Sequence, residues 1–133
     1  MEGKNMEDLN MCFACGKDNP IGFKLVFREV GENKVMAIFT PEEFHQGYPE
    51  VMHGGLITTL LDEAMAKVIN FRGIQAVTAT LEVKFRNPVP IGRELKIFGE
   101  LVEEKKRRCG MKAWVEDEEG NILAEASAVF IKL

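Results

Sequence analysis

Two adjacent carboxylates, Asp62 and Glu63, lie inside a largely apolar stretch, HGGLITTLLDEAMAKVIN, at residues 53–70. A carboxylate among apolar neighbours loses hydration, so a partner or a ligand must offset that cost. Asp62 is therefore either a catalytic base or nucleophile, or a structural acid that reaches solvent or bonds to a buried hydroxyl or N–H. Glu63 lies about 100° further around a helix, on the side of Lys67, and this four-residue spacing favours a solvated ion pair.

His53, Gly54 and Gly55 stand where this stretch begins. The first turn of a helix leaves N–H groups unbonded and carries the positive end of the helix dipole, which suits a developing oxyanion. The two glycines let another group approach the backbone closely, and they equally fit a tight turn. His53 is either a catalytic group or a structural histidine that is satisfied within the fold.

The spacing of these groups bears on the subunit structure. Seven residues at about 1.5 Å each place Asp62 about 10 Å along the helix axis from Gly55. One acyl carbon needs its base or nucleophile and its oxyanion donors within about 3 Å. Because one helix cannot supply both, a site that uses both groups must combine two copies of the helix. The spacing therefore predicts an obligate dimer with its site at the subunit interface.

The elements that position these residues follow from the hydrophobic pattern. Apolar residues recur at helical spacing from about Gly54 to Asn70, over a width that predicts a long buried helix. Alternating runs bounded by turn residues predict strands at 23–30, 34–39, 76–87, 94–103, 110–116 and 122–133. A segregated helix and a mostly antiparallel sheet of five to six strands make an α+β domain, with the helix on the concave face of the sheet.

The run at 76–87 alternates between polar and apolar residues. Successive strand residues point to opposite faces of a sheet. Strict alternation therefore puts Thr78 on the face of Glu82 and Lys84, and Val77 on the opposite face with Leu81.

Size and composition indicate one globular domain. The chain has 133 residues, with 46% hydrophobic and 29% charged residues and a net charge of −4. The acidic balance argues against a nucleic-acid partner. Residues 1–10 are polar and predicted to be flexible, and residues 11–133 form the domain. There is no signal-like start and no run of about 18 apolar residues, so we expect a cytoplasmic protein without a membrane partner.

Three cysteines are present, and two of them form the sequence Cys12-x-x-Cys15-Gly16, which is half of a zinc knuckle. Structural zinc usually needs four ligands, and only Cys109, His45 and His53 remain as soft donors. We therefore expect structural cysteines rather than a zinc site or a redox pair, and no metal or other cofactor.

HGG followed by Asp62 nine residues after the His, with VKFRNPVPIG ending the next strand, resembles the hotdog-fold thioesterases. The closest similarity is to acyl-CoA thioesterases of the phenylacetate-pathway type, and it covers residues 12–133. The resemblance implies a hotdog domain, in which the sheet wraps the central helix. It also implies hydrolysis of an acyl-CoA to a free acid and coenzyme A by an obligate homodimer, paired into a dimer of dimers.

The resemblance implies roles for individual residues. Asp62 matches the general base or nucleophile of the family, and Gly55 matches the glycine whose N–H polarises the thioester carbonyl. Thr78 matches a hydroxyl residue that positions water in some members. His53 and Gly54 flank the carbonyl site as catalytic and substrate-binding candidates.

Further binding residues are implied by where coenzyme A lies in this family, across the dimer interface with its phosphates near basic groups. Arg86 is one candidate, and Arg107 and Arg108 are others. These two arginines belong to a basic run, residues 105–108, that follows two glutamates and equally suits a solvated turn.

The loop before the helix departs from the family pattern. Many members carry an Asn six residues before the His, where this chain has Gly47. His45 or Gln46 would then take over the contact with the thioester.

Two rival functions remain. A hotdog dehydratase or hydratase is the first, because YPEVMHGGL and EAMA resemble its loop and helix, although the spacing from the glycines to Glu63 fits it poorly. The second is an acyl-CoA-binding module without turnover.

Overall fold

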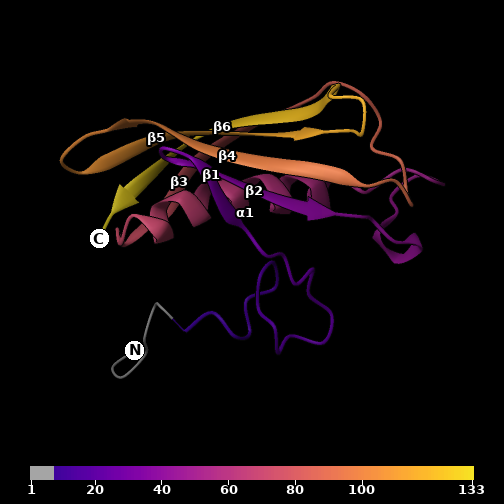
Figure 1. The fold of residues 1–133 in the computed structure, drawn as a ribbon, viewed down its shortest axis with the longest axis horizontal. Helices are drawn as coiled ribbons and strands as arrows, with labels where there is room; N and C mark the ends of the chain where they lie inside the picture. The colour runs from indigo at the N-terminus through magenta and orange to yellow at the C-terminus, as the bar shows by residue number, and fades with distance from the viewer. Residues whose placement is uncertain (1–7) are drawn as a thin grey trace.

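A six-stranded antiparallel sheet wraps one long helix in the computed structural model, which describes residues 8–133 (Figure 1). The strand order is β1-β2-β4-β5-β6-β3, and every neighbouring pair is antiparallel. The predicted α+β hotdog architecture is confirmed. The elements are β1 (Arg28–Gly31), β2 (Lys34–Phe39), the 3-10 helix η1 (Glu43–His45), α1 (Gly54–Phe71), β3 (Ala76–Phe85), β4 (Leu95–Glu104), β5 (Arg108–Glu116) and β6 (Ile122–Lys132).

The core lies between α1 and the concave face of the sheet. The helix buries seven apolar side chains there: Ile57, Leu60, Leu61, Ala64, Met65, Val68 and Ile69. Gly99 of β4 allows the closest approach, because a Cβ at this position would collide with the backbone carbonyl group of Ala64. The sheet therefore holds α1 at a distance set by backbone contact, which fixes the position of every side chain on the helix.

The first strand is shorter than the predicted 23–30. Phe23 and Leu25 are buried as the alternation requires, but Lys24 has a φ of 56°, which is incompatible with an extended strand. The backbone N–H groups of Phe23 and Leu25 donate instead to the carbonyls of Phe13 and Ala14. This segment thus pairs with the N-terminal coil rather than with the sheet. The predicted fifth strand also begins two residues earlier, at Arg108.

A bulge in β3 overturns the predicted faces of this strand. Thr78 pairs with Phe130 and Leu81 pairs with Ala128, so three steps along β3 match two steps along β6. The register shift lies between Thr78 and Thr80 and leaves one extra residue there. Because Phe130 and Ala128 are both buried, Thr78 and Leu81 share the face toward α1. Thr78 consequently points toward α1, although it stays exposed in the single chain.

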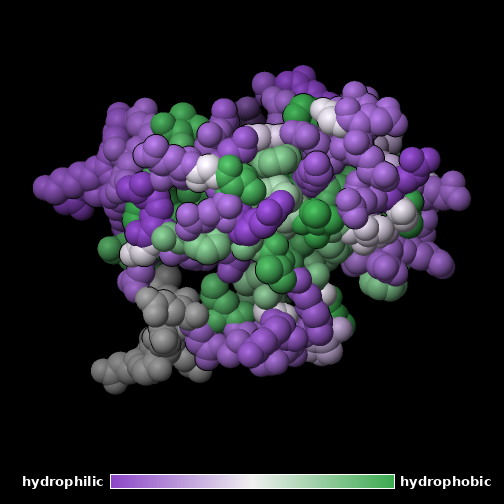
Figure 2. Space-filling view, viewed as in Figure 1, coloured by the Kyte–Doolittle hydropathy of each residue, from purple (hydrophilic) through white to green (hydrophobic). Residues whose placement is uncertain are grey.

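An N-terminal coil, residues 8–27, lies on the side of α1 away from the sheet (Figure 1). Most of the predicted flexible segment, residues 1–7, falls outside the described residues, and the domain boundary at residue 11 stays a prediction. Apolar surface gathers at the centre of the face that Figure 2 shows. None of the helices within residues 8–133 combines the length and the apolar content needed to cross a bilayer.

Candidate functional site

Asp62 and Thr78 meet between α1 and β3. The Thr78 hydroxyl donates a hydrogen bond of 2.8 Å to Asp62 Oδ1. The bulge makes this contact possible, since it turns Thr78 toward the helix. Within residues 8–133, the second carboxylate oxygen of Asp62 has no hydrogen-bond partner. The arrangement fixes the orientation of the carboxylate and leaves one oxygen available to a water molecule or a substrate.

His53 caps the start of α1. Its Nδ1 accepts a hydrogen bond of 2.9 Å from the Gly55 N–H, and its backbone carbonyl accepts from the N–H groups of Leu56 and Ile57. The N–H that the family assigns to the thioester carbonyl is therefore bonded to the His53 ring in the single chain. Among the described residues, the Gly54 N–H has no acceptor. The Gly54 N–H of this turn is thus free to bind an oxyanion, and the Gly55 N–H becomes free when the His53 ring turns away.

A surface hollow of about 480 Å³ lies beside this turn, a size in the range of small-molecule sites. Its lining is Gly47, Tyr48, Met52, His53 and Gly54. Tyr48 was missed by the sequence reasoning, although it is 84% exposed and an exposed aromatic residue in a loop is a recognisable binding signal.

The loop side chains proposed to bind the thioester are engaged locally. His45 Nδ1 accepts from the Glu42 N–H at 2.8 Å, and its ring packs among Phe23, Phe39 and Phe44. Burial lowers the pKa of His45, and the charge of Glu42 opposes this shift only in part. His45 is thus held neutral inside the loop.

Gln46 and Gly47 complete this loop. Gln46 Oε1 accepts from the Glu50 N–H at 2.6 Å. A Cβ at Gly47 would lie 3.1 Å from the Cα of His53, which is tighter than ordinary packing. An Asn at this position would therefore require His53 to shift by a few tenths of an ångström.

The basic candidates lie at opposite ends of α1. Arg86 follows β3, next to the helix start, and its Nη2 lies 3.1 Å from Glu125 Oε1. Arg107 and Arg108 lie at the β4–β5 turn, near the helix end. With 18 residues, α1 is about 27 Å long, so one chain does not bring the two groups together.

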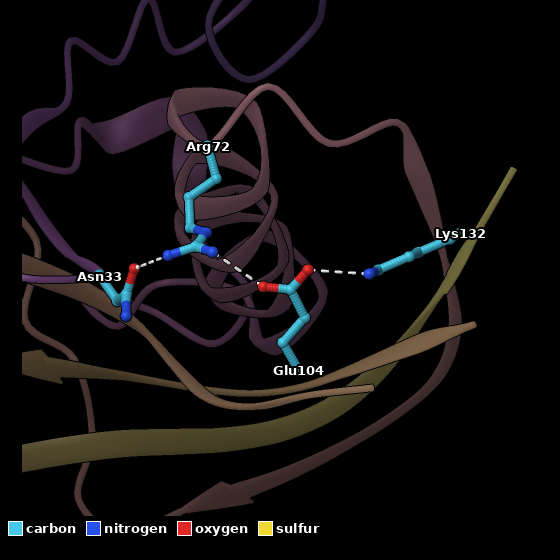
Figure 3. A network of polar contacts seen from close by, with 4 residues as sticks. All are labelled: Asn33, Arg72, Glu104 and Lys132. Atoms are coloured by element: carbon cyan, nitrogen blue, oxygen red, sulfur yellow. Dashed lines mark hydrogen bonds and ion pairs between the residues drawn. The ribbon is translucent and has the colours of Figure 1, made fainter. Parts of the chain in front are cut away.

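An ionic network closes the helix end nearest to Arg107 and Arg108 (Figure 3). Arg72 donates to Asn33 Oδ1 at 2.6 Å and to Glu104 Oε1 at 2.8 Å. Lys132 Nζ donates to Glu104 Oε2 at 2.8 Å. Within residues 8–133, neither Arg107 nor Arg108 has an ion-pair partner. Their charges are therefore available to an anion, unlike those of Arg72 and Lys132.

Glu63 faces a different environment from Asp62. It pairs with Lys67 at 3.7 Å, as the spacing predicts, but the pair is not solvated. The N-terminal coil leaves only 13% of the Glu63 side chain and 16% of the Lys67 side chain exposed. Burial raises the pKa of Glu63, against the opposing effects of Cys15 and Lys67. No pattern in the sequence predicts that this coil folds over the helix.

Comparisons with known proteins agree with this geometry. Residues 50–124 match the family described as the thioesterase superfamily. The chain is similar to acyl-coenzyme A thioesterase THEM5 of Mus musculus, with 31% identity over 111 residues, which are 82% of this chain and 44% of that protein. The chain spans about half the length of the curated relatives that it matches.

Two solved structures show the same fold. Protein smu.793 from Streptococcus mutans, bound to acetyl CoA, superposes with a TM-score of 0.77 and 20% identity, over 82% of this chain and 88% of the other. The phenylacetic acid degradation protein PaaI from Thermus thermophilus has a TM-score of 0.75 and 21% identity, over 82% and 93% of the two chains. The fold of these two structures and the family match together confirm the resemblance to the hotdog-fold thioesterases.

Proposed function

Because the chain belongs to the thioesterase superfamily, we propose that it hydrolyses an acyl-CoA to a free acid and coenzyme A, at a site shared by two subunits. The observation that carries this proposal is the hydrogen bond from Thr78 to Asp62, which presents one free carboxylate oxygen. The curated relatives are named acyl-coenzyme A thioesterases, and a structural neighbour contains acetyl CoA, which supports the substrate class.

The reaction needs a nucleophile and an oxyanion site. Asp62 takes a proton from water as the water oxygen adds to the thioester carbonyl carbon, or it attacks this carbon itself and the resulting anhydride is then hydrolysed. The tetrahedral oxyanion lies against the N–H groups of Gly54 and Gly55 of the partner subunit. The C–S bond then breaks and coenzyme A leaves as a thiolate, which needs no strong acid.

The edge strand β3 explains how the two halves of the site meet. It is the last strand at one edge of the sheet and is ten residues long, and its Val77 and Phe85 are 47% and 55% exposed. An uncovered edge of this length is a template for pairing with another strand. A two-fold axis through the middle of β3 lays it antiparallel to the β3 of a second copy, so that the exposed β3 edge of each chain is covered by the other.

The same pairing completes the site. It brings Thr78 of one chain opposite the Phe85 end of its partner's strand. In each chain this end touches the helix start, since a Cβ on Gly54 would lie 3.4 Å from the Phe85 ring. The first turn of one helix therefore lies near Asp62 of the other, which removes the separation of about 10 Å within a single helix. A further pairing of dimers stays a prediction.

The pairing also suggests where coenzyme A lies. Arg86 follows Phe85, so the partner's copy lies near the same Asp62 and is the closer candidate for a phosphate. Arg107 and Arg108 stand about 15 Å further along α1 from Asp62, within reach of the other end of an extended ligand. His45 and Gln46 carry no part of this proposal, because both are engaged within their loop.

Thiol release from a panel of short, long and aromatic acyl-CoAs tests the proposal. The parent releases coenzyme A, and Asp62→Asn abolishes this turnover. Asp18→Asn, which changes an exposed acid in the N-terminal coil, is the matched control and retains it. Tight acyl-CoA binding by the parent without thiol release from any member of the panel overturns the hydrolase and leaves a binding module.

The dehydratase alternative assigns the chemistry to Glu63. This side chain is covered by the N-terminal coil and lies beside Cys15, while Asp62 is the acid that meets Thr78. We therefore expect Glu63→Gln to retain thiol release. The acyl group of the substrate is left to the panel.

Expectations about location and other partners stay predictions. The net charge of −4 argues against nucleic acid, and three free cysteines suit a reducing, cytoplasm-like compartment.

A further inference from the structure

A cluster of three side chains takes no part in the proposed hydrolysis. Cys12 and Cys15 come from the N-terminal coil, and Glu63 comes from α1. Their two Sγ atoms and a carboxylate oxygen all lie within 4.8 Å of one another. All three residues are partly buried, and the cluster joins the N-terminal coil to α1.

The local backbone is built to bring the two cysteines together. The Gly16 N–H donates to the Cys12 carbonyl at 2.8 Å, which closes a turn around the two sulfur atoms. A Cβ at Gly16 would lie 2.5 Å from the Cys12 nitrogen and 2.6 Å from its carbonyl oxygen, so only glycine fits after the second cysteine. The tight turn keeps both sulfur atoms on the side of Glu63.

The sequence alone favours structural cysteines over a zinc site, but it does not show Glu63 beside them. We propose that Cys12, Cys15 and Glu63 bind one thiophilic divalent cation of the zinc class, which holds the N-terminal coil against α1. Zinc takes thiolates at about 2.3 Å and carboxylate oxygens at about 2.0–2.2 Å. Tetrahedral geometry then separates the ligand atoms by about 3.5–3.8 Å. The three donors reach this separation when their side chains move by about 1 Å, and water completes the fourth position at the partly open side.

The charges around the cluster balance when the cation is present. Two thiolates, one carboxylate and a divalent cation leave one negative charge, and the Lys67 ammonium, 3.7 Å from Glu63, neutralises it. Cysteine binds a metal ion as the thiolate, so binding is accompanied by release of thiol protons to solvent. With the cation bound, the partly buried Lys67 would balance the charge of the whole cluster and not of Glu63 alone.

The proposed cation is structural and separate from hydrolysis. Glu63 and Asp62 are adjacent in sequence, but they point about 100° apart around α1. Asp62 meets Thr78 of β3, on another side of the helix from the coil. Loss of the cation therefore loosens the coil without removing a group from the hydrolytic site.

Metal binding by the reduced, chelator-treated full chain tests the proposal. We expect one zinc ion per chain, and with cobalt alone as the probe we expect the intense visible bands of a tetrahedral site and a thiolate-to-metal charge-transfer band. Cys12→Ser and Cys15→Ser each remove one thiolate and lower the intensity of the charge-transfer band at least by half. Glu63→Gln weakens zinc binding at least about tenfold. Cys109→Ser is the control, since Cys109 is buried in β5 away from the cluster, and it binds zinc as the parent does.

A second readout needs no variant. Zinc added to the chelator-treated parent raises its Tm, since the cation binds the folded chain more tightly than the unfolded chain. No bound zinc or cobalt at micromolar metal, a cobalt spectrum without thiolate charge transfer, or a Cys12–Cys15 disulfide in protein isolated under reducing conditions overturns the proposal.

Discussion

Mixing two inactive variants tests whether the site is shared between subunits. Asp62→Asn removes the nucleophile or base, and Gly55→Pro removes the N–H at the helix start. Gly55 is the second residue of α1, within the first turn, where no intrahelical hydrogen bond is lost to proline. A Cβ there would lie 3.2 Å from the His53 ring, which must shift, so circular dichroism of Gly55→Pro alone checks that it folds. If each site takes Asp62 from one chain and Gly55 from the other, a heterodimer of the two variants contains one intact site and one site with both defects.

The expected magnitude follows from this geometry. Loss of one oxyanion donor lowers kcat by about 10²–10³-fold, and loss of the carboxylate lowers it at least as far. Each variant alone therefore retains about 1% of parental turnover or less. Random exchange in an equal mixture makes about half of the dimers heterodimers, and in each heterodimer one of the two sites is intact. The mixture therefore recovers about one quarter of parental activity. The increase over either variant is at least about 25-fold.

The assay is thiol release after the two variants are unfolded together and refolded. Each variant refolded alone is the control, and size-exclusion chromatography with light scattering confirms the dimer. If both groups acted within one chain, every chain in the mixture would carry a defective site. Given thiol release by the parent, recovery of no more than the average of the two variants therefore refutes the shared site.

Three further predictions follow from contacts in the single chain. Thr78→Val removes a hydroxyl–carboxylate hydrogen bond of 2.8 Å, so thiol release falls about tenfold to a hundredfold while the control Thr80→Val stays near the parent; equal rates for both variants contradict the positioning role. Gly99→Ala drives a Cβ into the helix backbone and lowers the free energy of unfolding by about 2 kcal/mol or more, measured by urea denaturation, whereas Gly110→Ala, with its nearest contact at 3.7 Å, changes it by about 0.5 kcal/mol or less. Burial holds the pKa of His45 below its ordinary value, so the unfolded chain binds more protons than the folded chain. The free energy of unfolding therefore falls as the pH drops below about 6.5, by at most about 1.4 kcal/mol per pH unit. Urea denaturation at several pH values should show that His45→Gln loses this part of the pH dependence, and an unchanged slope contradicts the prediction.

The periodic parts of this fold were predictable from the sequence. The helix was expected at Gly54 to Asn70 and is observed at Gly54–Phe71, because its apolar spacing and the absence of proline leave no other regular structure. Most strands were placed within two residues for the same reason. The separation of Asp62 from Gly55 was also predictable, since it depends only on the rise of a helix.

The parts that were not predictable depend on contacts between distant segments. The bulge that turns Thr78 toward α1 leaves no mark on the alternation of 76–87, because the extra residue, Ala79, is itself small and apolar. The coil over Glu63 is held by backbone hydrogen bonds from Phe23 and Leu25. Any residue except proline can donate such a bond, so the side chains do not reveal it. Local pattern therefore identified the important residues but assigned two of their environments wrongly.

A helix that is covered on most sides can carry two adjacent carboxylates only if each has partners of its own. Successive residues point about 100° apart, so a single helix reaches three different surfaces within one turn. In α1, Asp62 reaches β3, Glu63 reaches the N-terminal coil, and Ala64 packs against the sheet at Gly99. The two acids therefore belong to different tasks, and their effects should separate: changes at Asp62 should alter turnover with little effect on metal binding, and changes at Glu63 should do the reverse.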